Sequence, residues 1–227
     1  MLKKIFAFTL FLGFCIYLNA QSKSLSPFHA IKAATGLNVQ LVKGDAPKAE
    51  YTILKGKAED LYIEVENGEL IVKLKSKNGK WNRSETKANI TIYYTNLNAI
   101  DCSSGAYVYT DQAINSDKME IETSSGSKCK IILQCNEVVA NSSSGSSMTL
   151  EGKSKTATFD ASSGAKISAS SLIVNIAEAD VSSGANISLN AAKKLKADAS
   201  SGGSIKYKGK PEDVNINSGM SGSISSF

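Results

Sequence analysis

The sequence contains very few of the side chains on which most enzymes and metal proteins depend. Its 227 residues include one histidine, His29, one arginine, Arg83, and one tryptophan, Trp81. General acid–base catalysis therefore lacks its usual agents, and no Cys/His cluster has the spacing of a metal site. A single arginine without any basic run also argues against nucleic-acid binding. We predict a protein that is not an enzyme, has no cofactor and binds no nucleic acid.

Long hydrophobic runs are equally scarce. The only one, residues 5–18, follows two lysines and leads to Ala20, which is typical of a secretory signal peptide of residues 1–20. Cys15 does not make this a lipoprotein signal, because the residue directly before it, Phe14, is not small. No later stretch approaches the roughly 20 apolar residues needed to span a bilayer. We therefore expect an exported protein that does not span the membrane and that resides in the periplasm, at the cell surface or outside the cell.

The chain is rich in one short repeated motif. It consists of an acidic residue or Asn, then a small residue, and then Ser and Gly residues. Its copies are Asp101-Cys-Ser-Ser-Gly105, Glu122-Thr-Ser-Ser-Gly126, Asn141-Ser-Ser-Ser-Gly145, Asp160-Ala-Ser-Ser-Gly164, Asp180-Val-Ser-Ser-Gly184, Asp198-Ala-Ser-Ser-Gly202 and the worn Asn217-Ser-Gly-Met-Ser221. The steps between leading residues are 21, 19, 19, 20, 18 and 19. A fixed period of about 20 residues predicts a stacked repeat array. The drift in period and the absence of a six-residue aliphatic repeat exclude the left-handed acyltransferase helix.

Aligned copies show alternating apolar and polar columns on both sides of the Ser-Ser-Gly corner. One apolar column after the corner contains Val108, Cys129, Met148, Ile167, Ile187 and Ile205, and one before it contains Ile100, Ile121, Ala140, Phe159, Ala179 and Ala197. Alternation with period two indicates β-strands with an inward and an outward face. Stacked coils pair their strands in parallel, and parallel crossovers are nearly always right-handed. We predict an all-β fold, a right-handed parallel β-helix (β-solenoid) over residues 98–227.

Residues 21–97 also show strand alternation but lack the repeat. Asn67-Gly68 between two alternating runs predicts a β-hairpin with a type I′ turn. The segment forms either irregular first coils or a β cap, and a cap would protect the open edge of the first coil.

Three cysteines remain after removal of the leader, Cys102, Cys129 and Cys135. The first two fall in inward columns and are interpreted as small core residues. A bridge between Cys129 and Cys135 stays open, because sequence spacing alone does not establish a disulfide.

The acidic column offers two interpretations. Asp160, Asp180 and Asp198 should stack on adjacent coils, where repulsion between carboxylates could be relieved by Ca²⁺ if enough oxygen ligands gathered. The favoured interpretation is structural: Asp or Asn starts each corner by bonding nearby backbone N–H groups, which also explains the Asn copies.

One loop and several tyrosines are candidates for ligand contact. Trp81 lies in the polar, basic segment 75–87 and either stacks on a sugar or partner surface or folds over the cap. Tyr107 and Tyr109 alternate with inward residues and should lie on the outside of the early coils, with Tyr93 and Tyr94 nearby.

The mature chain resembles the family of putative auto-transporter adhesins with a head GIN domain. The resemblance rests on the Ser-Gly corners and on Phe28-His-Ala-Ile31, Val39-Gln-Leu-Val-Lys-Gly44, Gly68-Glu-Leu-Ile-Val72, Ile90-Thr-Ile-Tyr-Tyr94 and Leu97-Asn-Ala-Ile100. It implies a β-helix shaped like the pectin lyases but without their catalytic residues, and a role in adhesion. No functional residue is carried over.

Two functional hypotheses follow, with a third kept beside them. The first is a non-catalytic exported module that binds glycan or protein at the cell envelope or surface. The second is a structural or self-associating envelope protein, in which an uncovered C-terminal coil, residues 221–227, stacks on a partner. The third is a calcium-dependent polysaccharide-active enzyme.

Overall fold

The computed structural model describes residues 21–76 and 85–227. The described residues form seventeen strands in one continuous sheet, a single 3₁₀ turn, η1 (Ala58–Asp60), and no α-helix. The N-terminal strands are β1 (Gln21–Ser24), β2 (Ala30–Ala33), β3 (Asn38–Lys43), β4 (Lys48–Lys55), β5 (Leu61–Glu66), β6 (Glu69–Leu74) and β7 (Lys87–Tyr94). The repeat supplies β8 (Ala99–Cys102), β9 (Tyr107–Thr110), β10 (Ile114–Thr123), β11 (Lys128–Ser142), β12 (Ser147–Ala161), β13 (Lys166–Val181), β14 (Asn186–Ala199), β15 (Ser204–Lys208), β16 (Asp213–Ser218) and β17 (Ser223–Ser226).

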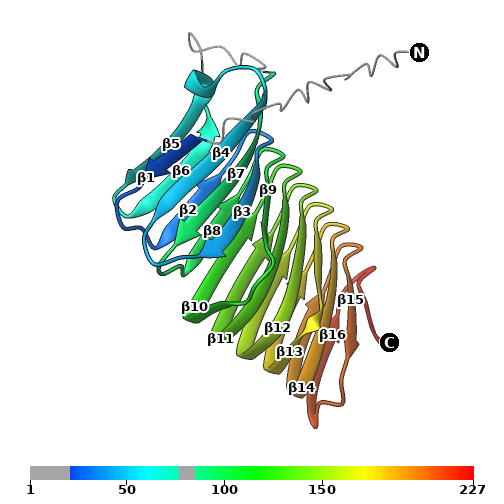
Figure 1. Cartoon of the computed structure of the whole chain (residues 1–227). Coiled ribbons are helices and arrows are strands. Elements are labelled where there is room, and N and C mark those ends of the chain that lie inside the picture. The colour runs from blue at the N-terminus through cyan, green and yellow to red at the C-terminus, as the bar shows by residue number, and fades with distance from the viewer. Residues whose placement is uncertain (1–20, 77–84) are drawn as a thin grey trace, which may run out of the picture.

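The strands of the repeat wind into a flattened parallel solenoid (Figure 1). Each of β11, β12 and β13 leaves one Ser-Ser-Gly corner, passes through a bend near its middle and enters the next corner. We call the strand segments that enter a corner the upstream face and those that leave it the downstream face. Neighbouring coils pair in register, for example Ile121 with Ala140 and Cys129 with Met148. The predicted β-solenoid and its period are confirmed.

Each corner is a tight turn closed by the backbone. In the fourth copy Ser163 and Gly164 have φ values of 52° and 71°, and the Ala165 N–H donates to the Ser162 carbonyl over 3.0 Å. Two consecutive residues with positive φ and an i to i+3 hydrogen bond define a type I′ turn. The Gly164 N–H then donates to Ser183 of the next coil, also over 3.0 Å. The expected carboxylate-to-amide bond of an Asx corner is not found in the described part of the chain, so backbone geometry rather than the leading acid builds the corner.

The inward columns form the core. Val108, Met148, Ile167 and their equivalents are buried, as are Ile121, Phe159 and the rest of the upstream column. Like side chains stack on one another along the axis because the register repeats from coil to coil. The predicted assignment of inward and outward columns is confirmed.

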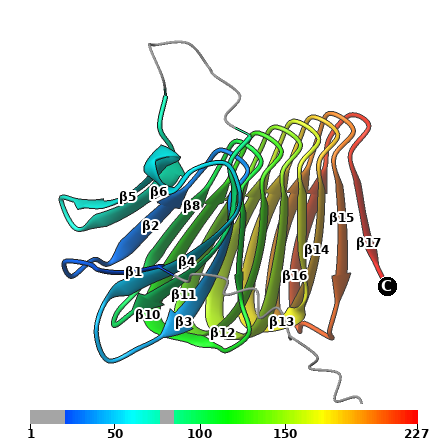
Figure 2. The ribbon, with the colours of Figure 1, turned by 45° about the horizontal axis from the view of Figure 1, so that its top comes forward.

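The N-terminal segment provides both a coil and a cap (Figure 2). β2 and β3 form a coil with its own corner at Thr35 and Gly36, and this coil pairs directly with β8 and β9. The chain then leaves the solenoid, and β6 and β7 return to the outer side of that first coil.

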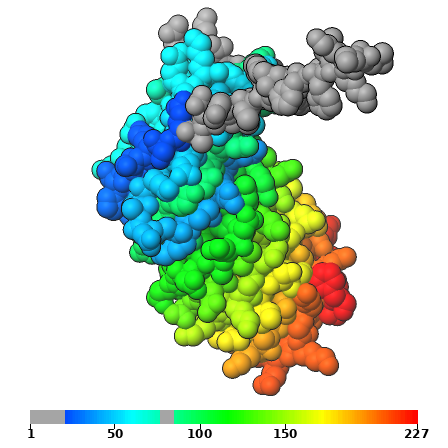
Figure 3. Space-filling view, in the orientation of Figure 1, coloured from blue at the N-terminus to red at the C-terminus, as the bar shows by residue number. Residues whose placement is uncertain are grey.

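Antiparallel strands finish this end of the solenoid. β5 pairs with β6 through the predicted type I′ hairpin, in which Asn67 and Gly68 have φ values of 51° and 79°. β4 pairs antiparallel with β7, and β1 with β4. In the space-filling view the capped N-terminal end and the C-terminal coils lie at opposite ends of an elongated molecule (Figure 3).

Candidate binding surfaces

The downstream face presents the tyrosines that the sequence singles out. The rings of Tyr107 and Tyr109, both on β9, stack with centroids 5.2 Å apart and an interplanar angle of 18°. They project outward because they alternate with the buried Val108 and Thr110. Tyr107 borders a hollow of about 530 Å³, which we call the downstream hollow and which is also lined by Asn38, Lys128, Lys130, Ser147 and Thr149.

Lysines continue this surface along the solenoid axis. Lys128 pairs in register with Tyr107, and Lys130 with Tyr109. Lys130 lies 3.5 Å from Glu151, whereas Lys128 and Lys166 form no ion pair with any residue in the described ranges. The downstream face therefore combines an aromatic platform with unneutralised positive charge.

The other expected aromatic contacts are placed differently. Tyr93 lies on the outside but donates its hydroxyl to Glu50 over 3.0 Å and is covered by the ammonium of Lys48. Tyr94 is buried, so the expectation that it lies on the outside is wrong: it points to the same inward side of β7 as Ile90 and Ile92. Trp81 falls outside the described residues.

The upstream face carries the acidic ladder. Asp160 pairs in register with Asp180, and Asp180 with Asp198. The pKa of Asp180 is raised above its ordinary value, first by partial burial and then by the two neighbouring carboxylates. Asp198 accepts a hydrogen bond from the Asn217 amide over 3.0 Å. Within the residues described, no group of three or more acidic, Cys or His side chains is arranged to hold a metal ion, so the geometry gives the calcium interpretation no support.

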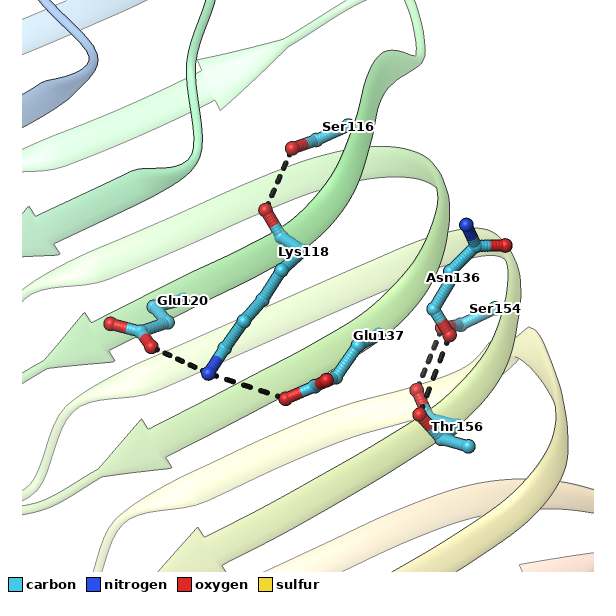
Figure 4. Close-up of polar contacts among 7 residues, drawn as sticks. All are labelled: Ser116, Lys118, Glu120, Asn136, Glu137, Ser154 and Thr156. Carbon is cyan, nitrogen blue, oxygen red and sulfur yellow. Dashed lines mark hydrogen bonds and ion pairs between the residues drawn. The ribbon is translucent and has the colours of Figure 1, made fainter.

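Lysines and glutamates pair in the outward positions beside the acidic ladder. The Lys118 ammonium lies 3.0 Å from Glu120 on its own strand and 3.3 Å from Glu137 on the next coil (Figure 4). Lys196 pairs with Glu178 on the neighbouring coil, over 2.5 Å. Exposed pairs of this kind contribute little to stability, but they neutralise part of the upstream face.

A third surface, which the sequence analysis missed, lies at the bend between the two faces. Four adjacent coils enclose a depression of about 900 Å³, which we call the bend trough. Its outward residues face one another from coil to coil: Asn115 pairs with Gln134, Gln134 with Lys153, and Lys153 with Ile173. Asn136 and Lys155 form part of a second row beside them.

Unequal coil lengths explain the trough. The coils beginning at Glu122 and Asn141 have 19 residues each, whereas the coil before them has 21 and the one after them has 20. The corners are alike, so the extra residues are accommodated away from them, and the register shifts between Thr149 and Glu151 where β12 meets β13. Two short coils thus form the floor and two longer ones the rims. The sequence signal was present in the repeat spacing, but the spacing does not say where in a coil the extra residues lie.

Local contacts shape the floor of the trough. Gly152 has a φ of +115°, and a Cβ there would lie 2.0 Å from the Leu133 carbonyl oxygen, so only glycine allows the two coils to approach this closely. Ser154 donates to the Thr156 carbonyl over 2.7 Å, and Ser116 does the same to Lys118 (Figure 4). These hydroxyls satisfy carbonyls where the strand turns, which fixes the bend.

The three cysteines in the described part of the chain are free. Cys102 and Cys129 are buried in the interior, as expected for core residues, and Cys135 is half-buried at the floor of the trough. The open question of a Cys129–Cys135 bridge is thereby answered: there is none. Burial raises the pKa of the Cys102 thiol to about 11 and that of Cys129 well above its ordinary value.

Fold and surface together define a class of protein: a capped β-solenoid whose outer faces are polar and whose interior is closed by stacked apolar side chains. Within residues 21–76 and 85–227 there is no helix of the length and apolarity that a bilayer crossing requires. The chain belongs to the family described as "Putative auto-transporter adhesin, head GIN domain", whose model matches residues 27–211. The family resemblance seen in the sequence is therefore confirmed.

Solved structures share the fold. A "putative adhesin" from Bacteroides fragilis superposes with a TM-score of 0.81 at 22% identity, covering 92% of this chain and 96% of that one. A "putative lipid binding protein" from Parabacteroides distasonis gives 0.72 at 21% identity, with the same coverage. A "putative adhesin" from Parabacteroides merdae gives 0.72 at 15% identity, covering 92% and 95%. No curated protein sequence matches the chain significantly.

Proposed function

We propose that the protein is a non-catalytic adhesin-like module that binds glycan or protein at the cell envelope or surface through its downstream face. The observation that carries the proposal is the stacked Tyr107–Tyr109 pair beside the unpaired Lys128. Aromatic faces bind the C–H surfaces of sugars and the apolar side chains of proteins, and Tyr adds a polar hydroxyl. Family membership and the adhesin descriptions of its structural neighbours support the same role.

Export is part of this proposal. Residues 1–20 lie outside the described structure, and their sequence pattern supports a cleaved leader. Mass spectrometry of the protein recovered from its host should find Gln21 as the first residue. Detection of an intact Met1 in the mature protein would contradict the proposal.

The direct test is binding of the purified protein to a glycan array and to intact bacterial envelopes, with and without calcium. The double variant Tyr107→Ala/Tyr109→Ala should lose at least about tenfold in affinity, because two contact aromatics are removed. Tyr62→Ala, which removes a half-buried tyrosine from the cap, is the matched control and should bind normally. Equal binding by the double variant and the Tyr62→Ala control would exclude the downstream face as the binding surface. Degradation of a polysaccharide by the wild-type protein would contradict the non-catalytic role.

A second candidate function, self-association, is favoured by the C-terminal edge. Val214 and Ile216 are 43% and 41% exposed, although their partners one coil earlier, Leu195 and Ala197, are buried. Asp213 is the only charged side chain on β16 and β17, and it pairs with Lys194 over 2.7 Å. Edge strands without charges invite pairing with another chain.

A second copy of this chain is the partner that fits this edge best. The opposite end is covered by antiparallel strands, so two copies would meet edge to edge about a two-fold axis rather than head to tail. Light scattering over a range of concentrations should show a dimer that Ile216→Lys abolishes and that Asn215→Lys, on the outward side of the same strand, affects less. A monomer at every concentration would reject this candidate.

A further inference from the structure

We propose that the bend trough is a binding site for a short acidic oligosaccharide. The trough lies at the bend rather than on the downstream face, so the inference is independent of the contacts proposed above. Its volume of about 900 Å³ falls in the range of roughly 300–1,000 Å³ that ligand sites occupy. The rims are three coil spacings apart, about 14 Å at the usual strand separation, which suits a few linked sugar rings.

The backbone of the trough floor is largely engaged. β11 and β12 pair with neighbouring coils on both sides of the bend, and at the bend the hydroxyls of Ser116 and Ser154 occupy the carbonyls of Lys118 and Thr156. An extended peptide that binds by adding a strand needs a free edge. Recognition in the trough therefore depends on side chains, which favours a ligand rich in hydroxyl and carboxylate groups.

The charges of the trough select an anion. Lys153 and Lys155 project outward from alternate positions of β12, on either side of the buried Ser154, and neither forms an ion pair within the described part of the chain. The one carboxylate at the rim, Asp117, accepts a hydrogen bond from the Asn136 amide. The two ammonium groups thus remain free to form charge-assisted hydrogen bonds with sugar carboxylates.

The remaining side chains match the rest of a sugar. The amides of Asn115 and Gln134 supply donors and acceptors for hydroxyl groups. Ile173 is 45% exposed on the far rim and offers an apolar contact for the C–H face of a ring. Figure 4 shows the bend beside these residues, where Ser116, Asn136 and Ser154 lie on successive coils.

Calorimetric titration with tri-galacturonate tests the proposal, and maltotriose is the neutral trisaccharide control. We expect saturable binding of tri-galacturonate that weakens as salt screens the charges, and much weaker binding of maltotriose. Lys153→Gln/Lys155→Gln should weaken binding at least about tenfold, since each variant side chain loses a charge-assisted contact. Lys73→Gln/Lys87→Gln removes two exposed lysines from the cap strands β6 and β7, away from both the trough and the downstream hollow, and should leave the affinity unchanged.

Cys135 supplies a second readout. Its thiol lies at the floor of the trough, whereas Cys102 and Cys129 are buried, so alkylation of the native protein should report on Cys135. Bound tri-galacturonate should slow this alkylation, and maltotriose at the same concentration should not. Three results would each overturn the proposal: no binding of tri-galacturonate, equal binding of maltotriose, or a loss of affinity in the Lys73/Lys87 variant instead of the Lys153/Lys155 variant.

Discussion

The ladder at Ile167 provides the sharpest test of how this solenoid is held together. Ile167 is completely buried and stacks in register between Met148 and Ile187. Truncating a buried Ile costs about 2–5 kcal/mol through lost burial and the cavity left behind. Ile167→Asp adds an unpaired carboxylate to that site, and an uncompensated buried charge costs about 3–5 kcal/mol. The expected loss of at least about 5 kcal/mol is comparable to the total stability of many domains.

The adjacent residue provides the control. Lys166 points outward and forms no ion pair within the described residues, so Lys166→Asp should change stability by less than about 0.5 kcal/mol. Ile167→Val, at about 0.5–1.5 kcal/mol, provides a graded intermediate that is expected to fold. Urea denaturation followed by far-UV circular dichroism measures all three, and whole curves should be fitted because repeat arrays can unfold in steps.

Acidity distinguishes a buried charge from a mere cavity. Burial disfavours the charged carboxylate and raises its pKa in the folded state, so the penalty of Ile167→Asp is smallest below the unfolded-state pKa of about 3.9. The penalty should grow as the pH rises from there towards the folded-state pKa. Equal destabilisation by Ile167→Asp and Lys166→Asp would refute the assignment of inward and outward columns.

Three further outcomes are expected. Gly164→Ala should destabilise by about 1 kcal/mol in the same urea assay, because φ is +71° and the surrounding space is open, so backbone strain is the only cost; a neutral effect would contradict the corner geometry. Asp180→Asn should stabilise the protein at pH 7 by roughly a few tenths of a kcal/mol after solvent screening. Because the pKa of Asp180 is raised in the folded state, this gain should disappear as the pH falls below the ordinary aspartate pKa of 3.8. A gain that persists in acid would show another cause. A thiol reagent at pH 8 should modify Cys135 slowly in the folded protein and reach Cys102 and Cys129 only after unfolding; rapid reaction of all three would contradict their burial.

Much of the repeat could be predicted from the sequence because each coil restates the same local pattern. The alternation around Ile167 and Phe159 fixes which side chains point inward, since successive residues of a strand face opposite sides. The Ser-Ser-Gly motif marks the positions of the corners, although the interactions that close each corner differ from those expected. The second Ser and the Gly adopt positive φ, and the closing hydrogen bonds come from the backbone rather than from the leading Asp.

The candidate surfaces were only partly accessible from the sequence. The stacking of Tyr107 on Tyr109 follows from their spacing of two along one strand, and their exposure was expected. Tyr94 was misplaced although a local sign was present: its spacing of two from Ile92 puts it on the inward side of the same strand. The bend trough was missed because it is formed by four coils together.

The period, the inward columns and the Gly-containing corners follow from the amino-acid pattern, because each depends on neighbours a few residues apart. The pairing of β2 with β8, almost 70 residues further along, is visible only in the folded protein, where the chain between them folds back over the outer edge as a cap. The strand registers likewise place the extra residues of the longer coils at the bend, next to the trough that Cys135 and Gly152 line. The physical reason is the same in both cases: local patterns specify which face of a strand is buried, but pairing between distant strands and the fit of unequal coils depend on packing across the whole solenoid.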